Sequence, residues 1–176
     1  LLVVLTFGME TGFFRFANKG DDDPKKVYSV SLLMVGGVSL IFLLLCLVFL
    51  NPIAGLMGYG EHPWYLGMML IVLAMDAIQA IPFAYLRYKK RPIKFVALKM
   101  FFIVLNIALN LIYYLIIGGS NVFYAFLFNL ICTSIVMILL IPDLKFRGGF
   151  DKVLAKKMLN YSYPILILGV AGILNQ

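Results

Sequence analysis

Charged residues are scarce in this chain of 176 residues. Only 13% of the residues are charged, whereas 63% are hydrophobic and the mean hydropathy is +1.00. A water-soluble domain cannot bury that much apolar surface in its core, but a lipid bilayer can surround it. The composition therefore excludes an ordinary soluble domain and predicts a polytopic membrane protein.

Metal-binding and redox-active residues are also few. The single histidine, His62, stands in the loop sequence GEHPWY with no second ligand near it in the sequence. The two cysteines, Cys46 and Cys132, fall inside apolar runs and form no CxxC motif. Widely separated thiols of this kind usually pack as small hydrophobic side chains. We therefore expect neither a metal site nor a cofactor.

Long apolar runs indicate the fold class. Crossing a bilayer takes roughly 20 helical residues. Four runs approach or exceed that length: 28–50, 64–87, 95–118 and 121–142. Shorter apolar runs at 1–14 and 163–176 are expected to be cut spans, and the Gly36-Gly37 pair is expected to allow close helix packing. We predict an all-α, polytopic transmembrane helical bundle that forms a single lobe over residues 1–176.

The residues that follow Asp151 have a different pattern. Phe150, Val153, Leu154 and Met158 recur at helical spacing, while lysines occupy other positions. This pattern predicts a short amphipathic helix over about residues 151–160 that lies at the membrane interface.

Positive charge is confined to alternate loops. All 15 Lys and Arg residues lie within residues 15–26, 87–99 and 145–157, and the loops around 51–63 and 118–121 hold none. Because short loops rich in Lys and Arg stay in the cytoplasm, the three basic segments are predicted to be cytoplasmic. The net charge of +7 is thus an orientation signal. We expect no nucleic-acid partner, since no soluble basic face is large enough to bind a duplex.

One carboxylate lies inside a membrane-length apolar run, in the sequence LAMDAIQAIPF (residues 73–83). A charge near the bilayer centre costs about 2.5–3.5 kcal/mol on insertion scales, so Asp76 must pair, bind a proton or face water. Pro82 removes a helical hydrogen bond nearby and predicts a kink. We expect Asp76 to face a water-accessible cavity between helices, with Gln79 beside it.

Amide side chains recur in the two runs that follow. Lys99, Asn106 and Asn110 share one helical face, and Asn129 and Thr133 are four residues apart. Interhelical hydrogen bonds, worth about 0.6 kcal/mol each, are the interpretation that we favour for Asn129 and Thr133. For Asn106 and Asn110 two interpretations stay open: interhelical hydrogen bonds, or lining of the cavity across from Asp76.

The most specific stretch in the chain is FGMETGFFRFANKGDDDPKKVYS (residues 7–29). It resembles the end of the second transmembrane helix and the following cytoplasmic loop of the Wzx-like oligosaccharide flippases. These are bacterial polysaccharide-biosynthesis membrane proteins of the multidrug/oligosaccharidyl-lipid/polysaccharide exporter superfamily. Three further stretches are similar to the same family: DAIQAIPFAYLRYKKRPIKF (76–95), LNIALNL (105–111) and MLNYSYPILILGVAGILNQ (158–176). The resemblance covers nearly the whole chain, through family-typical motifs rather than catalytic signatures.

That resemblance implies a multi-pass transporter of the bacterial cytoplasmic membrane, with fourteen transmembrane helices in two lobes around a central cavity. The chain would be a partial N-terminal lobe, from the end of the second helix to the start of the seventh. By alternating access it would move an oligosaccharide on a polyprenyl pyrophosphate carrier to the periplasmic leaflet. Membrane lipids and other polysaccharide-assembly proteins would be its further partners, and no enzymatic activity is implied.

Such a substrate needs cations for its phosphates and hydrogen-bonding groups for its sugars. Arg15 at a helix end and Lys99, about a turn inside its span, are predicted phosphate contacts. Alternatively, both only extend to the interface, and Glu10 neutralises Arg15. The predicted substrate-contacting or cavity-lining residues are Arg15, Asp76, Gln79, Lys99, Asn106 and Asn110.

Two other functions stay open. A drug or metabolite exporter of the same superfamily, coupled to Na⁺ or H⁺, would use Asp76 as its ion site. A membrane-embedded enzyme, such as a glycan polymerase or acyltransferase, would need acid, base or nucleophile side chains that converge at a membrane face. The outer loops are short and His62 has no visible partner, which favours transport over enzymatic activity.

Overall fold

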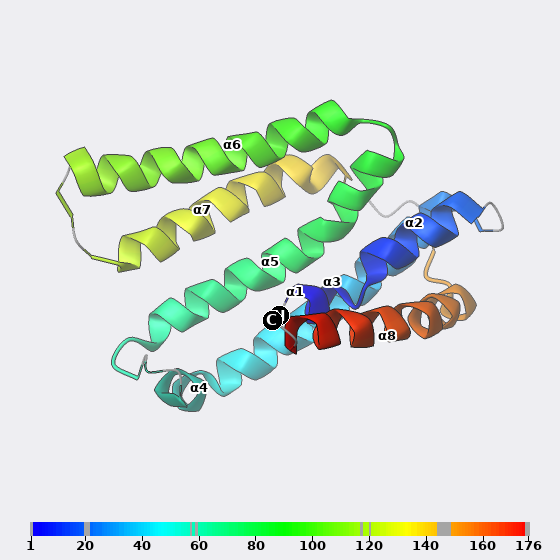
Figure 1. Cartoon of the computed structure of the whole chain (residues 1–176), viewed down its shortest axis with the longest axis horizontal. Coiled ribbons are helices and arrows are strands. Elements are labelled where there is room, and N and C mark those ends of the chain that lie inside the picture. Colours follow the sequence, from blue (N-terminus) through cyan, green and yellow to red (C-terminus); the bar gives the residue numbers. More distant parts are fainter. Residues whose placement is uncertain are drawn as a thin grey trace.

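Helices make up nearly all of the computed structural model of the protein, which describes residues 2–19, 22–56, 58, 60–116, 118–119, 121–143 and 149–174 (Figure 1). The elements are α1 (Leu2–Thr6), α2 (Met9–Lys19), α3 (Pro24–Val48), α4 (Leu50–Leu56), α5 (Pro63–Tyr88), α6 (Pro92–Leu111), α7 (Phe123–Leu140) and α8 (Lys152–Leu174). A π-helical turn over Ile112–Ile116 extends α6, and a 3-10 turn over Ile141–Asp143 extends α7. No strand occurs in these described ranges, so the predicted all-α fold is confirmed.

Four of these helices are long and apolar enough to cross a membrane: α3, α5, α6 with its π-helical turn, and α7. They overlap the four predicted runs, with ends that differ by one to four residues. Three of them begin at a proline, a few residues before the predicted start. A proline suits the first helical position because its missing N–H would have no helical partner there. Four helices could therefore span a membrane, which is consistent with a multi-pass membrane protein.

The long helix α5 lies in the middle of the bundle (Figure 1). The hairpin of α6 and α7 lies on one side of α5, and most of its contacts with α5 are made by α7. Helices α1, α2 and α3 lie on the other side of α5. The last helix, α8, packs on α1, α2 and α3. Side chains on α5 can therefore meet residues that lie far from them in the sequence.

Aromatic rings join α2, α3 and α5. Tyr28 and Phe13 are fully buried, and the ring centroids of Tyr28 and Tyr85 lie 4.5 Å apart. Phe13 packs edge-on against Tyr85 at 6.2 Å and against Tyr88 at 5.8 Å. The Tyr88 hydroxyl donates to the Ala17 carbonyl at 3.2 Å. These contacts hold the ends of α2 and α5 together, and so position the charged residues described below.

The first apolar run is two helices rather than the single cut span expected over residues 1–14. Phe7 and Gly8 separate α1 from α2, and both have positive φ angles, of 50° and 63°. A Cβ at Gly8 would lie 2.9 Å from Cγ2 of Ile165 in α8, so only glycine fits there. This left-handed break was not recognisable from hydropathy, because the residues around it are apolar.

The last apolar run also differs from its prediction. The sequence predicted an interfacial helix over 151–160 and a separate cut span from 163, but α8 continues without interruption through Pro164. The stripe that packs inward is centred on Leu154 and Met158, which are buried four residues apart. Phe150 and Val153, which the sequence placed on the apolar face, are 52% and 67% exposed.

Asp151 caps the start of α8. Its Oδ1 accepts hydrogen bonds from the backbone N–H groups of Leu154 at 3.1 Å and Val153 at 2.9 Å. These bonds, with a smaller contribution from Lys26 and Lys157, hold the pKa of Asp151 below its usual value. Because the folded pKa is lowered, this cap stabilises the protein above the unfolded pKa and is lost as the pH falls through the folded pKa.

Close helix contact occurs at Gly12 rather than at the predicted Gly36-Gly37 pair. A Cβ at Gly12 of α2 would lie 2.8 Å from Oγ of Ser162 in α8. Nothing among the described residues lies within 4 Å of a Cβ built at Gly36 or Gly37. The glycines of α3 therefore do not bring helices together in this part of the protein.

We expect Gly12→Leu to destabilise the protein by about 1–3 kcal/mol, because the new side chain would push α8 away from α2. Gly36→Leu is the matched control, since it makes the same exchange within a helix that has open space. Thermal unfolding in detergent measures both. Equal loss of stability in the two variants would show that the α2–α8 contact is not close.

Candidate functional site

One face of α5 carries Asp76, Phe83 and Arg87, which follow one another at positions i, i+7 and i+11. At about 3.6 residues per turn, these positions share one side of a helix. Phe83 is buried, Asp76 is half-buried and the Arg87 side chain is 39% exposed. This face of α5 therefore has a buried ring between two charged side chains.

Lys99 of α6 meets this face. Its Nζ lies 4.5 Å from the ring centroid of Phe83, and its ammonium attracts the Asp76 carboxylate. Among the described residues, Asp76 accepts no hydrogen bond and forms no ion pair within 4.0 Å. A carboxylate that is attracted by a cation but not fixed by hydrogen bonds is free to bind a proton or a metal cation.

Arg87 connects α5 to α2 and α6. It forms an ion pair with Glu10, through Nη2 and Oε1. Its guanidinium lies 5.3 Å from the ring centroids of both Phe14 and Phe95. Phe95 in turn packs edge-on against Phe83, at 5.5 Å.

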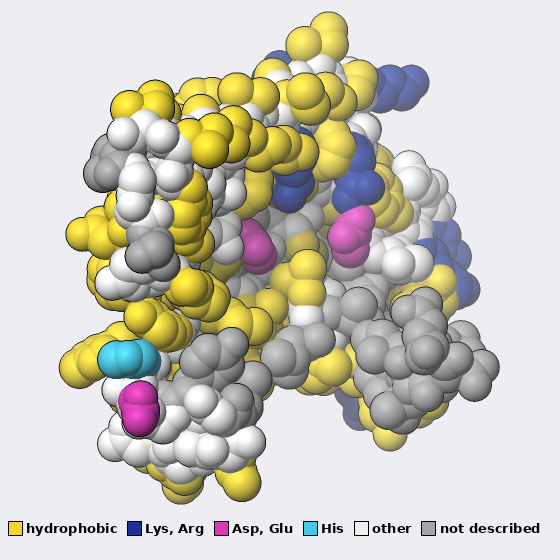
Figure 2. Space-filling view, turned by 60° about the vertical axis from the view of Figure 1, so that its left-hand side comes forward, with side chains coloured by type: hydrophobic (Ala, Val, Ile, Leu, Met, Phe, Trp, Pro, Cys, Tyr) yellow, Lys and Arg dark blue, Asp and Glu magenta, His cyan; other side chains and the backbone are white. Residues whose placement is uncertain are grey.

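These contacts link residues of three helices into one group, and Asp76 lies on the same face of α5 within the electrostatic range of Lys99. We call it the charged cluster, and it consists of Glu10, Asp76, Phe83, Arg87, Phe95 and Lys99. Figure 2 shows basic and acidic side chains beside one another in a hollow between apolar surfaces. The cluster combines cations and carboxylates at a place where most side chains are apolar, which is suited to the passage or binding of a charged group.

Arg15 lies away from this cluster. Its guanidinium is 4.0 Å from the ring centroid of Tyr161 in α8, and the residue is exposed. The hypothesis that Glu10 neutralises Arg15 is wrong, because Glu10 pairs with Arg87. Residues five apart do not face one another on a helix, so the nearest cation in the sequence is not the nearest in space. The sequence analysis did not select Arg87. Its position 11 residues after Asp76 places both side chains on one face of a helix, and this spacing could have identified it.

Gln79 joins α5 to α7 instead of lining a cavity. It is 3% exposed, and its Nε2 donates to the backbone carbonyl of Thr133 at 3.2 Å. The Ser134 hydroxyl approaches the Met75 sulfur at 4.0 Å on the same interface. Gln79 therefore has an interhelical role. The Thr133 hydroxyl itself has no partner within the described ranges.

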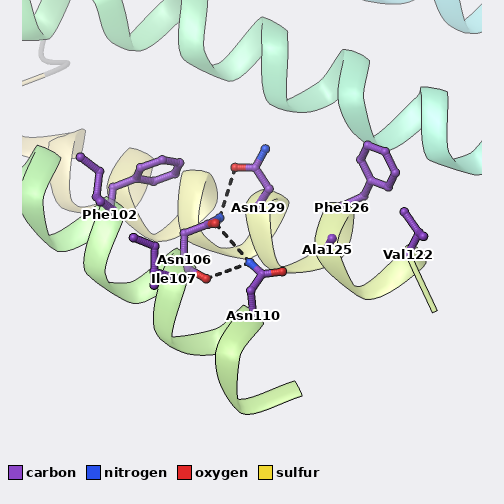
Figure 3. Close-up of a pocket in the computed structure, with 9 residues that line it drawn as sticks. Phe102, Asn106, Ile107, Asn110, Val122, Ala125, Phe126 and Asn129 are labelled. Atoms are coloured by element: carbon purple, nitrogen blue, oxygen red, sulfur yellow. Dashed lines mark hydrogen bonds between the residues drawn. The ribbon is translucent and has the colours of Figure 1, made fainter. Parts of the chain in front are cut away.

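A second polar region lies between α6 and α7 (Figure 3). The Asn110 amide donates to the backbone carbonyl of Asn106 at 2.8 Å and to its side-chain oxygen at 3.2 Å. The Asn106 amide donates to Oδ1 of Asn129 at 3.5 Å. These three side chains line a groove of about 420 Å³, which we call the amide groove. Its lining residues are Phe102, Ile103, Asn106, Ile107, Asn110, Val122, Ala125, Phe126 and Asn129.

The sequence predicted one cavity with Asp76 and Gln79 on one side and the asparagines across from them. The structure separates these residues: Asp76 lies in the charged cluster, and Gln79 is buried against α7. Asn106 and Asn110 lie in the amide groove. Gln79 follows Asp76 by three positions, so its side chain points about 60° away from that of Asp76 around the helix axis. This difference is enough for α7 to cover Gln79 but not Asp76.

A metal ion in the described ranges would need a group of side chains close enough to hold it. No three His, Cys, Asp or Glu side chains there lie close enough to hold a metal ion. Comparison of the chain with protein-family models, with curated proteins and with solved structures finds no match. The charged cluster and the amide groove are the polar regions of the described residues that bear on function.

The pairing of Glu10 with Arg87 can be measured by a double-mutant cycle with Glu10→Gln and Arg87→Gln. Because both side chains are about 40% exposed, we expect a coupling energy of about 0.2–1 kcal/mol. Denaturant unfolding of the purified protein provides the four stabilities.

The matched control is the cycle of Glu10→Gln with Arg15→Gln. It removes the same charges from a pair that is not in contact, so its stabilities should be additive. Additivity in the first cycle, or coupling only in the second, would show that Glu10 has been assigned the wrong partner.

Proposed function

We propose that this chain is part of a flippase that moves polyprenyl-pyrophosphate-linked oligosaccharide across the bacterial cytoplasmic membrane by alternating access. The observation that carries the proposal is the charged cluster. Asp76 lies inside the apolar helix α5, Lys99 lies about two turns into α6, and Arg87 lies in the last turn of α5. Ionisable residues inside spans face the bundle interior or a water-filled pathway, where they act on ions or charged substrates.

The cations of the cluster suit a phosphate ligand. Lys99 forms no ion pair within 4.0 Å among the described residues, so its ammonium is open to an anion. Arg87 has five N–H donors, and its bond to Glu10 uses only part of them. Arg15, held over Tyr161 and exposed, offers a further cation at the predicted cytoplasmic end of α2. These groups fit a pyrophosphate, as the resemblance implies.

The architecture fits the same proposal. Four helices long enough to span, with α1, α2 and α8 packed beside α3, are compatible with the partial N-terminal lobe that the sequence resemblance implies. The other lobe would then complete the cavity that the charged cluster faces. Membrane lipids and polysaccharide-assembly proteins would be its neighbours in the bacterial cytoplasmic membrane. The sequence resemblance supports this assignment.

A Na⁺- or H⁺-coupled exporter of the same superfamily is the second candidate. One observation favours it: Asp76 is attracted by Lys99 but accepts no hydrogen bond among the described residues. A carboxylate in this state can exchange a proton or a sodium ion with a water-filled pathway. In the exporter, this exchange would drive transport; in the flippase, Asp76 would hold Lys99 in place for the phosphate.

We expect Lys99→Gln and Asp76→Leu each to lower glycan export by about tenfold, equivalent to roughly 1.4 kcal/mol of lost interaction. Asp76→Asn keeps the shape of the side chain and should keep part of the export. Surface polysaccharide is measured in a strain that lacks its own flippase, after equal membrane levels have been verified by immunoblot.

Lys25→Gln is the matched control, because it removes the same charge from an exposed position at the start of α3. Wild-type export by both Lys99→Gln and Asp76→Leu would contradict the role of the charged cluster. Proton-driven uptake of a cationic dye by the wild type in proteoliposomes, lost in Asp76→Asn, would favour the exporter instead.

A further inference from the structure

The amide groove has a lining without charge. Its polar side chains are those of Asn106, Asn110 and Asn129, and its other lining residues are apolar or aromatic. A charged ligand would find no counter-ion there, and burial of an unpaired charge is costly. The chemistry of the lining therefore selects a neutral ligand with hydrogen-bonding groups.

The hydrogen bonds within the groove leave a donor and an acceptor unused. Among the described residues, Asn129 Nδ2 donates to no group and Asn110 Oδ1 accepts from none. Figure 3 shows these two atoms at opposite ends of the chain of asparagines. Both residues are half-buried, and lipid acyl chains could pair with neither atom. A ligand with several hydroxyl groups, each both donor and acceptor, would satisfy both ends.

Aromatic rings complete the site. Phe102 and Phe126 belong to the lining, on α6 and α7. The Phe126 ring stacks on Tyr65 of α5, with centroids 5.5 Å apart and planes at 18°, so its position is fixed. Ligand sites typically combine apolar and aromatic walls with a few well-placed polar groups. The C–H faces of a sugar ring suit such walls, while its hydroxyls suit the amides.

The groove is separated from the charged cluster along α6. Asn110 lies 11 residues after Lys99, which corresponds to about 16 Å along the helix. A ligand with an anionic group at Lys99 and a neutral chain beyond it could therefore occupy both places. A lipid-linked oligosaccharide has this distribution of charge.

From these observations we propose that the amide groove binds uncharged sugar residues of the transported glycolipid, apart from the charged cluster that attracts its phosphates. This inference rests on the proposed function. It assigns Asn110 and Asn129 to sugar recognition, with Asn106 as the residue that positions both.

Site-specific photocrosslinking tests the inference in membranes of cells that depend on the protein for glycan export. The crosslinker p-benzoylphenylalanine is placed at Ile107, which lines the groove, or at Val104, which does not line it and is 59% exposed. A third position, Phe95, reports on the charged cluster, because the crosslinker replaces an aromatic ring there and Lys99 is kept. After illumination, the purified protein is analysed for attached glycan by lectin blot and mass spectrometry.

We expect glycan to be attached at Ile107 and not at Val104. In the Ile107 background, Asn110→Leu and Asn129→Leu should each lower glycan attachment by about two- to tenfold, since each removes a neutral hydrogen bond. Asn18→Leu is the control, because this exposed asparagine lies on α2 and donates to the Phe14 carbonyl of the same helix. Each groove variant should lose only about 0.6 kcal/mol of stability in detergent, the value of one interhelical hydrogen bond, so a larger loss would indicate lost folding rather than lost recognition.

Two results would overturn the inference. Attachment of phospholipid or of another protein segment at Ile107, with glycan attached at Phe95, would leave the flippase proposal in place but remove the sugar site. Unchanged glycan attachment in both groove variants would assign the asparagines to helix packing alone. Absence of glycan at Phe95 and Ile107 together would instead contradict the flippase proposal itself.

Discussion

The structure depends on one constraint: a polar group on a membrane-spanning helix must find a partner other than lipid. Arg87 meets it through Glu10 and two aromatic rings, and Gln79 meets it through the backbone of α7. Lys99 rests on Phe83 and is attracted to Asp76. The three asparagines bond in series. Each of these solutions joins different helices, so the polar residues also determine which helix faces meet.

This constraint divides the polar residues into two regions with different chemistry. The charged cluster lies where α2, α5 and α6 meet, and the amide groove lies between α6 and α7. Helix α5 packs against α3 on one side and against α7 on the other. It contributes Asp76, Phe83 and Arg87 to the charged cluster. Its residues Gln79 and Tyr65 contact α7, which forms one wall of the amide groove. A substrate with an anionic part and a neutral part matches this division, which links the architecture to the proposed transport.

Hydropathy was sufficient to predict the all-α fold and the four spans, because both follow from the length of apolar runs. It could not predict the break at Phe7 and Gly8 or the continuous course of α8, since these depend on contacts between distant residues. For the site, Asp76 and the asparagines could be selected as polar residues in apolar runs. The partners of these polar residues could not be predicted. Arg15 is the cation nearest to Glu10 in the sequence, but it lies on another side of α2, and Glu10 pairs with Arg87 instead.

The central claim is that the charged cluster and the amide groove face water and substrate rather than lipid. Single cysteines at Lys99, Asn110 and Val104, in a background without Cys46 and Cys132, test it through reaction with a water-soluble thiol reagent in native membranes. Thiolates form and react only where water has access. The account predicts that positions 99 and 110 react at least about tenfold faster than position 104 on the same helix. Equal rates, or faster reaction at position 104, would contradict it.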